Sequence, residues 1–196
     1  MQFEEKKFTV PELKGISAKT MEEHLKLYAG YVKNINLICE KMGEYSAEPE
    51  KNAYAMSELQ RRFGFEFDGM RNHEIYFDSL QGGAQELPAD SKFKTALEKQ
   101  VPFEQWFAGF KTLAMTRGVG WAILYVDTTD GRLWCTFVED HQLGQLVGCV
   151  PILALDMWEH AFVADYQPSG KKQYVEDFFA NLNWKKIEEN FDKAAK

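Results

Sequence analysis

The chain has 196 residues, of which 45% are hydrophobic and 14% aromatic, so it is long enough to bury a core and has the composition of a globular protein. A formal net charge of −7 argues against general nucleic-acid binding, which needs a basic surface. No apolar run approaches the roughly 20 residues of a membrane span, and the start MQFEEKKF lacks the apolar core of a signal peptide. Three scattered cysteines favour reduced, buried thiols over a disulfide framework. We therefore expect a cytoplasmic protein that binds neither nucleic acid nor membranes.

The N-terminal half has the pattern of two long amphipathic helices. The first helix is expected from Lys14 to about Met42, with Gly15 and Ser17 as capping residues. The second is expected from about Asn52 to Leu80, after a turn that contains Pro49. Residues of the inward faces recur every three or four positions, and they are Met21, His24, Tyr28, Tyr31, Ile35 and Ile38, then Leu59, Phe63, Phe67, Met70, His73, Phe77 and Leu80. The pattern predicts an antiparallel helical hairpin.

The stretch from Gln81 to Ser91 is the most linker-like part of the chain, and we expect it to divide an N-terminal domain, 1–85, from a C-terminal domain, 86–196. Short runs rich in aromatic and β-branched residues follow two further helices, and Asp130-Gly131 is a hairpin signal between the first two runs. The expected elements are helices at Phe93–Gln100 and Pro102–Arg117, strands at Gly120–Val126, Leu133–Val138 and Val150–Leu155, and helices at about Met157–Tyr166, Tyr174–Leu182 and Trp184–Ala195. The sequence therefore predicts an α+β fold, in which the hairpin precedes an α/β domain with a three-stranded antiparallel sheet and flanking helices.

Four residues carry the donor groups of a candidate metal site. Asp156 follows the apolar run Val150–Leu155, and His160 comes four residues later, so both side chains share one face of a helical turn. Of the other three histidines, His24 and His73 lie on the helical stripes. Three neutral imidazoles and one carboxylate suit a first-row transition metal such as iron or manganese better than calcium or magnesium. On its helix alone, His24 is better explained as a histidine at the edge of a core.

Gly69 interrupts the second helix four residues before His73, on the same face. A glycine inside a helix costs about 1 kcal/mol relative to alanine, so a packing reason is expected. We expect Gly69 to leave space beside His73 for a side chain that arrives from another part of the chain.

Four dispersed motifs occur in the order typical of one known family. They are ISAKTMEEH from Ile16 to His24, RNHEIYF from Arg71 to Phe77, GVGWAIL from Gly118 to Leu124 and DMWEHA from Asp156 to Ala161. Together they resemble the iron/manganese superoxide dismutases, and the resemblance runs from about Leu13 to the C-terminal helix. It implies a homodimeric enzyme that disproportionates superoxide to dioxygen and hydrogen peroxide by alternating reduction and oxidation of one iron or manganese ion per subunit.

The resemblance also implies the site residues. The expected metal ligands are His24, His73, Asp156 and His160. His141 stands where a glutamine or a histidine of the family hydrogen-bonds the metal-bound solvent, and Tyr31 is similar to the gateway tyrosine of the proton-delivery network. Iron-type relatives commonly carry a glutamine where Gly69 stands, whereas manganese-type relatives have glycine there. Because a histidine at 141 occurs among iron-using and dual-metal relatives, iron and manganese both stay open, and the balance inclines to iron.

Trp121, Trp158 and Phe77 resemble the aromatic wall that keeps the site dry, although the two tryptophans are equally well explained as ordinary core residues. In the family, Glu159 pairs with the ligand histidine of a partner subunit, so it is expected to bridge to His160 across a dimer. Such a bridge would link the two metal sites across the dimer.

Three positions depart from the family pattern. Tyr28 replaces a histidine in the first helix, Val163 replaces a tyrosine after the last ligand, and Phe77 replaces a tryptophan. Superoxide is an anion, so a chain of net charge −7 needs local positive charge near the site, for which Lys26, Lys33, Lys171 and Lys172 are available. The alternative to the enzyme is a non-catalytic, metal-binding dimeric scaffold protein of the same fold.

Overall fold

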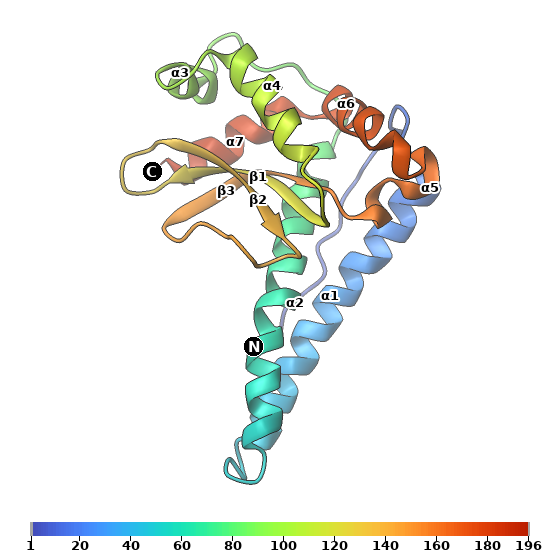
Figure 1. Cartoon of the computed structure of the whole chain (residues 1–196), viewed down its shortest axis with the longest axis vertical. Helices are drawn as coiled ribbons and strands as arrows, with labels where there is room; N and C mark the ends of the chain where they lie inside the picture. The colour runs from blue at the N-terminus through green and yellow to red at the C-terminus, as the bar shows by residue number, and fades with distance from the viewer. Residues whose placement is uncertain (1, 196) are drawn as a thin grey trace.

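A computed structural model describes residues 2–195, and its first part is a pair of long antiparallel helices (Figure 1). Helix α1 spans Ala18–Tyr45 and helix α2 spans Ala53–Leu80. Helix α1 begins four residues after Lys14, directly behind the expected capping residue Ser17, whose hydroxyl accepts a hydrogen bond from the Thr20 amide at 3.1 Å. The tip of the hairpin projects away from the rest of the molecule, while its other end packs against the sheet (Figure 1).

The extended N-terminal segment is attached to the hairpin by polar contacts. The Phe3 backbone exchanges two hydrogen bonds with the Asn36 side chain, at 2.8 and 2.9 Å. Further along, the Lys6 amide donates to the Tyr28 hydroxyl at 2.9 Å, and the Lys6 ammonium lies 2.7 Å from a Glu74 carboxylate oxygen. These contacts join the segment to both long helices.

The second part contains one antiparallel sheet with the strand order β2-β1-β3. Its strands are β1 (Gly120–Asp127), β2 (Leu133–Glu139) and β3 (Cys149–Asp156). The central strand β1 is almost completely buried, and α2 packs against β3. In the register of the sheet Trp121 lies opposite Asp156 on β3 and Val138 on β2, so the end of the sheet that faces the hairpin gathers residues of the predicted site. The α+β architecture predicted from the sequence is confirmed.

Helices flank the sheet on the side away from the hairpin tip (Figure 1). They are α3 (Lys92–Glu98), α4 (Phe103–Ala114), α5 (Val163–Tyr166), α6 (Lys171–Asn181) and α7 (Trp184–Ala194). The single helix expected at Met157–Tyr166 was wrong. The Met157 amide donates to the Gly120 carbonyl at 2.8 Å, which continues the attachment to β1, and a 3₁₀ turn at Glu159–Ala161 then precedes the one-turn helix α5.

The cysteines and the hydropathy of the helices can be compared with what the composition led us to expect. The cysteines form no disulfide within residues 2–195, as expected, but they are not buried: Cys135 is exposed, and Cys39 and Cys149 are partly exposed. In the same part of the chain, no helix has the length and the apolar character needed to cross a membrane.

Candidate metal centre

The four predicted donor residues come together at the junction of the hairpin and the sheet. His24 is on α1, His73 on α2, Asp156 at the end of β3, and His160 in the 3₁₀ turn that follows. One Asp156 carboxylate oxygen, Oδ2, lies 3.0 Å from His24 Nε2, 3.1 Å from His160 Nε2 and 3.6 Å from His73 Nε2. The four donor atoms all lie within 4.8 Å of one another. Donor atoms that share one ion at about 2.1 Å lie roughly 3 to 4 Å apart, so the arrangement fits a single ion.

The ring of His73 is oriented for metal binding. Its Nδ1 lies 2.6 Å from the Gly69 carbonyl oxygen, which can only accept, so Nδ1 carries the ring proton and Nε2 carries the lone pair. Nε2 is buried and has no hydrogen-bond partner among the described residues. Burial, reinforced by the neighbouring His24, holds the pKa of His73 well below its ordinary value, so the ring stays neutral. The lone pair of His73 is thus buried and unpartnered, and it faces a carboxylate and two further imidazoles. Three imidazoles and one carboxylate are a donor set that suits a transition metal.

Asp156 is held so that one oxygen faces the histidines. Its other oxygen, Oδ1, accepts the backbone N–H of Trp158 at 2.8 Å, and its backbone carbonyl accepts the Tyr174 hydroxyl at 2.9 Å. Complete burial opposes ionisation, but the hydrogen bonds and charges of His160 and His24 outweigh it and hold the pKa of the Asp156 carboxyl below its ordinary value. The site therefore keeps one negative charge among three imidazoles.

His141 approaches this cluster from the turn after β2, and its ring is bound at both nitrogens. The Trp121 indole donates its Nε1–H to His141 Nδ1 at 2.9 Å, and an indole N–H cannot accept. Burial lowers the pKa of His141 to about 4, so the ring is neutral at pH 7 and carries its proton on Nε2. His141 Nε2–H then donates to the Tyr31 hydroxyl oxygen at 2.7 Å. Tyr31 keeps its own proton, because burial and the charge of Asp156 raise its pKa above the ordinary value.

Gly69 provides the space in which these two side chains meet. A Cβ atom added there would lie 2.7 Å from Tyr31 Cδ1 and 3.2 Å from His141 Cδ2. Both distances are shorter than ordinary carbon contacts. The side chains that fill the space beside His73 are therefore Tyr31 from α1 and His141 from the sheet domain.

Aromatic rings enclose the cluster. Phe77 and Trp121 are completely buried, and their ring centroids lie 4.9 Å from those of His24 and His73, respectively. The Trp158 ring stacks on His141 at 4.9 Å, and its indole N–H donates to the Asp140 carbonyl at 3.1 Å. The tryptophans thus do more than line the site, since each donates a hydrogen bond that fixes His141 or the residue before it.

Two residues of this enclosure were not predicted from the sequence. Tyr76 lies 4.9 Å from His24 between ring centroids, and Phe65 lies 4.5 Å from His141. Tyr76 directly precedes Phe77, which the sequence placed in the site wall, so its position in the sequence is a usable signal. Phe65 lies eight residues before His73, about two helical turns, so helical spacing could have placed it on the same side of α2.

Four of the residues at or around the cluster are only partly buried. These are Tyr31, Phe65, Trp158 and His160. The Arg62 guanidinium lies 3.5 Å above the Phe65 ring and forms an ion pair with Glu66 at 2.9 Å, while 48% of its side chain stays exposed. Lys26, which the sequence offered as a steering charge, is also paired, with Glu22 at 2.6 Å and with Glu23 at 3.1 Å.

The predicted dimer residue stands apart from the cluster. Glu159 is exposed and forms no side-chain hydrogen bond or ion pair within residues 2–195. The departure at Tyr28 has a local explanation, since its hydroxyl donates to Glu74 at 3.3 Å and accepts the Lys6 amide, so it serves the N-terminal segment. Val163 begins α5.

Comparison with known proteins identifies the family. The model described as iron/manganese superoxide dismutases, alpha-hairpin domain, matches residues 7–81, and the model of the C-terminal domain matches residues 89–190. A protein named Superoxide dismutase (Fe) from Aquifex pyrophilus is 32% identical over 189 residues, which cover 94% of this chain and 88% of that protein. One with the same name from Cupriavidus metallidurans is 33% identical, with coverages of 94% and 93%. Superoxide dismutase (Mn) from Mycobacterium leprae is 30% identical, with coverages of 86% and 80%.

The family models therefore cover both halves of the chain, and relatives above 30% identity match nearly all of it. The resemblance found in the four sequence motifs is confirmed. The chain belongs to the iron/manganese superoxide dismutase family.

Proposed function

We propose that His24, His73, Asp156 and His160 bind one iron or manganese ion per subunit and that the chain is a superoxide dismutase. The observation that carries this proposal is the convergence of four donor atoms within 4.8 Å, with the His73 Nε2 lone pair buried and unpartnered among the described residues. Once bound, such an ion supplies one-electron redox chemistry, by which one superoxide is oxidised to dioxygen and a second, with two protons, is reduced to hydrogen peroxide. The protein residues bind and orient the reactants and deliver protons.

Tyr31 and His141 are proposed to deliver and orient protons. Because His141 Nε2–H donates to the Tyr31 oxygen, the Tyr31 O–H is directed away from His141 and is free to donate to a reactant. Trp121 fixes the His141 tautomer that makes this possible. A proton for the reduced substrate is therefore held at the Tyr31 hydroxyl oxygen, close to the four donors.

The aromatic residues around the site are proposed to exclude bulk water. Phe77, Trp121 and Tyr76 are fully buried, so these sides of the cluster are dry. A dry site strengthens the hydrogen bonds and charge interactions within it. Trp158 closes the remaining side while also supporting the turn that carries His141.

Arg62 is proposed to attract superoxide to the approach. It is half exposed, lies over the ring of Phe65, and its charge opposes the rise in the pKa of Tyr31 that burial causes. A positive charge at the mouth of a site raises the local concentration of an anionic substrate even when the net charge of the protein is negative.

The metal that we propose rests on two residues that contact Tyr31, namely Gly69 and His141. The relatives include proteins named for iron and proteins named for manganese, so either ion fits the family. We propose iron by a small margin over manganese, because the family resemblance implies that a histidine at 141 occurs among iron-using and dual-metal relatives, whereas Gly69 points to the manganese-type arrangement.

We further propose a homodimer in which Glu159 bridges to the partner's copy of His160. Its support is that Glu159 is exposed and carries no partner in the described part of a single chain, while the His160 side chain is 22% exposed beside it. The division into domains 1–85 and 86–196 stays a prediction. It is supported by the two family models, since the match of the first ends at residue 81 and that of the second begins at residue 89. The cytoplasmic location also stays a prediction.

The test is superoxide disproportionation by protein reconstituted separately with iron and with manganese, with bound metal quantified. Activity with iron exceeding that with manganese at equal loading is expected. His160→Ala should lose metal and activity together, and His141→Ala should keep the metal and lose most activity. Stoichiometric metal with no turnover in either form would favour the non-catalytic scaffold protein instead.

A further inference from the structure

His141 lies at the tip of a tight turn, which we call the His141 turn and define as residues 139–143. The turn is closed by two backbone hydrogen bonds between Glu139 and Leu143, of 2.9 and 3.1 Å. Asp140 has a φ of 50°, a left-handed conformation that is uncommon outside glycine. Of the five residues in the turn only His141 is buried, whereas Glu139 and Leu143 are exposed, so the buried backbone polar groups of His141 depend on partners outside the turn.

Two side-chain amides hold the backbone of the turn. Asn72 Nδ2 donates to the His141 carbonyl at 3.1 Å, and Gln145 Nε2 donates to the same oxygen at 3.0 Å. Gln145 Nε2 also lies 3.3 Å from Asn72 Oδ1, which joins the two amides. Asn72 is 2% exposed and directly precedes the predicted ligand His73 on α2. The two amides therefore link the metal-binding helix to the turn that carries His141.

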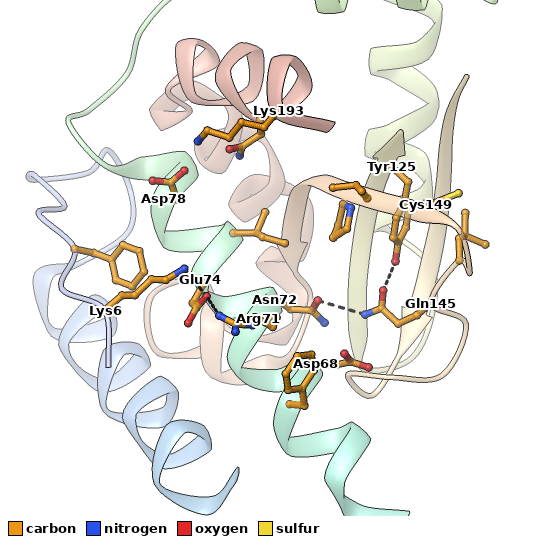
Figure 2. A pocket seen from close by; sticks show the side chains of 17 residues that line it. Lys6, Asp68, Arg71, Asn72, Glu74, Asp78, Tyr125, Gln145, Cys149 and Lys193 are labelled. Atoms are coloured by element: carbon orange, nitrogen blue, oxygen red, sulfur yellow. Dashed lines mark hydrogen bonds and ion pairs between the residues drawn. The ribbon is translucent and has the colours of Figure 1, made fainter. Parts of the chain in front are cut away.

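Gln145 is itself anchored by the sheet. The Tyr125 hydroxyl donates to Gln145 Oε1 at 2.5 Å, and Tyr125 is on the central strand β1 (Figure 2). Asn72, Gln145 and Tyr125 line a cavity of about 680 Å³ between α2, β3 and the N-terminal segment, as Figure 2 shows. Hydrogen bonds thus run from β1 through Gln145 to the His141 carbonyl, where Asn72 joins them. The ring of the same residue forms the hydrogen bonds with Trp121 and Tyr31.

We propose that Asn72 and Gln145 are positioning residues, which act on the reaction by fixing the backbone of His141 and so the hydrogen bond from its ring to Tyr31. This inference rests on the proposed role of His141. Without the amides, the buried His141 carbonyl has no partner from either side chain, and a buried carbonyl without a partner is unfavourable enough for the turn to rearrange. A rearranged turn moves Nε2 away from the Tyr31 oxygen while the four metal donors stay on their own elements.

Asn190 offers a matched control that separates the positioning of His141 from a merely structural role. Asn190 lines the same cavity and donates its side-chain N–H to a backbone carbonyl, that of Ile152, at 3.3 Å. It forms no hydrogen bond with the His141 turn among the described residues. Asn190→Leu therefore removes an amide of the same kind from the same cavity without touching His141.

The experiment compares Asn72→Leu, Gln145→Leu, Asn190→Leu and His141→Ala in the metal-loaded enzyme. Bound metal, the thermal midpoint, kcat and the midpoint potential of the bound ion are measured for each. Removing groups that orient the residues around a metal typically costs about 10- to 100-fold in activity. We expect kcat to fall about 10- to 100-fold in Asn72→Leu and Gln145→Leu, with metal content retained and the potential shifted in the direction that His141→Ala gives. Asn190→Leu should keep the kcat and the potential of the unchanged enzyme.

A double variant separates action through His141 from independent damage. If Gln145 acts through His141, adding Gln145→Leu to His141→Ala lowers kcat no further. An additive double variant would overturn the proposal, as would an unchanged potential and kcat in both leucine variants beside an altered His141→Ala. An unchanged His141→Ala would instead overturn the proposed role of His141. Where a leucine variant fails to fold, Tyr125→Phe removes only the hydroxyl anchor, and it must shift potential and kcat in the same direction.

Discussion

Gly69→Ala is the change that the structure predicts most sharply, because it adds one methyl group where two side chains meet. The new Cβ would lie 2.7 and 2.9 Å from two ring carbons of Tyr31 and 3.2 Å from His141 Cδ2. Carbon atoms pack at about 3.5 to 4.0 Å, so the Tyr31 ring must move by about 1 Å. Such overpacking costs about 1 to 3 kcal/mol. Replacing a helical glycine with alanine returns about 1 kcal/mol, which leaves a net destabilisation of about 0 to 2 kcal/mol.

We expect Gly69→Ala to lower the activity more than the stability. The hydrogen bond of 2.7 Å between Tyr31 and His141 cannot survive a ring displacement of that size unchanged. A misplacement of about 1 Å near the reacting groups can cost about 100-fold in rate, so we expect kcat to fall about 10- to 100-fold. The assay is superoxide disproportionation at matched metal content, beside the midpoint of denaturant-induced unfolding.

Gly64→Ala is the matched control, five residues earlier in the same helix. Its added Cβ would meet only Gln142 carbons at 3.8 and 3.9 Å, which is ordinary contact. It should therefore gain up to about 1 kcal/mol of stability and keep full activity. If Gly69→Ala matched Gly64→Ala in both stability and kcat, the argument that Gly69 reserves space for Tyr31 and His141 would be refuted.

Three further predictions concern charged groups. Burial raises the pKa of Asp68 to about 6 in the folded protein from 3.8, so its charge lowers stability above pH 6 and has no effect below about pH 4. Asp68→Asn should therefore stabilise the protein above pH 6 by about 1 to 2 kcal/mol, a value reduced for partial exposure, in unfolding curves taken across that range. Arg62→Ala should lower kcat/KM and weaken its dependence on ionic strength, since the exposed cation attracts superoxide. Glu159→Ala should raise the dimer dissociation constant measured by sedimentation, because it removes the proposed pair with His160 of the partner subunit.

Arg62→Ala has a matched control variant, and each of the other two changes has an outcome that would contradict its reasoning. Arg61, next to Arg62 and paired with Glu58, carries the same charge away from Phe65, so Arg61→Ala should alter the ionic-strength dependence much less. Equal effects of the two arginine changes would reduce the role of Arg62 to net charge. For Asp68→Asn, a stability gain that persists below pH 4 would rule out the ionisation argument. A Glu159→Ala protein as tightly dimeric as the unchanged one would exclude the bridge.

Much of the fold could be predicted because its elements follow local rules. The hairpin helices have clear three- and four-residue periods, and the cap at Ser17 is local chemistry. The segment after Asp156 could not be predicted, because its conformation depends on a hydrogen bond from Met157 to Gly120, which is far away in the sequence. A helical period was therefore expected where the sheet instead determines the backbone.

The candidate site likewise has residues that could be predicted from the sequence and residues that could not. The donor residues could be found because ligand types are few and the motif DMWEH is local. The resemblance also indicated His141, but the tautomer of its ring could not be read from the sequence, since it follows from the indole of Trp121 on another strand. Asn72 and Gln145 were missed because an amide gives no sign in the sequence of the carbonyl that it will bind. Arg62 was not predicted, and lysines were named as the steering charges instead, because only the fold shows which cation lies over Phe65.

The amides that hold the His141 turn contact a backbone carbonyl, which every amino acid carries. These hydrogen bonds therefore fix the position of the backbone at residue 141 and do not depend on the side chain there. Evolution, or a protein engineer, can exchange the side chain at this position for another of suitable volume while the turn keeps its place. On the proposed role of His141, a substitution at this single position changes the redox properties of the proposed metal centre while its four proposed ligands stay the same.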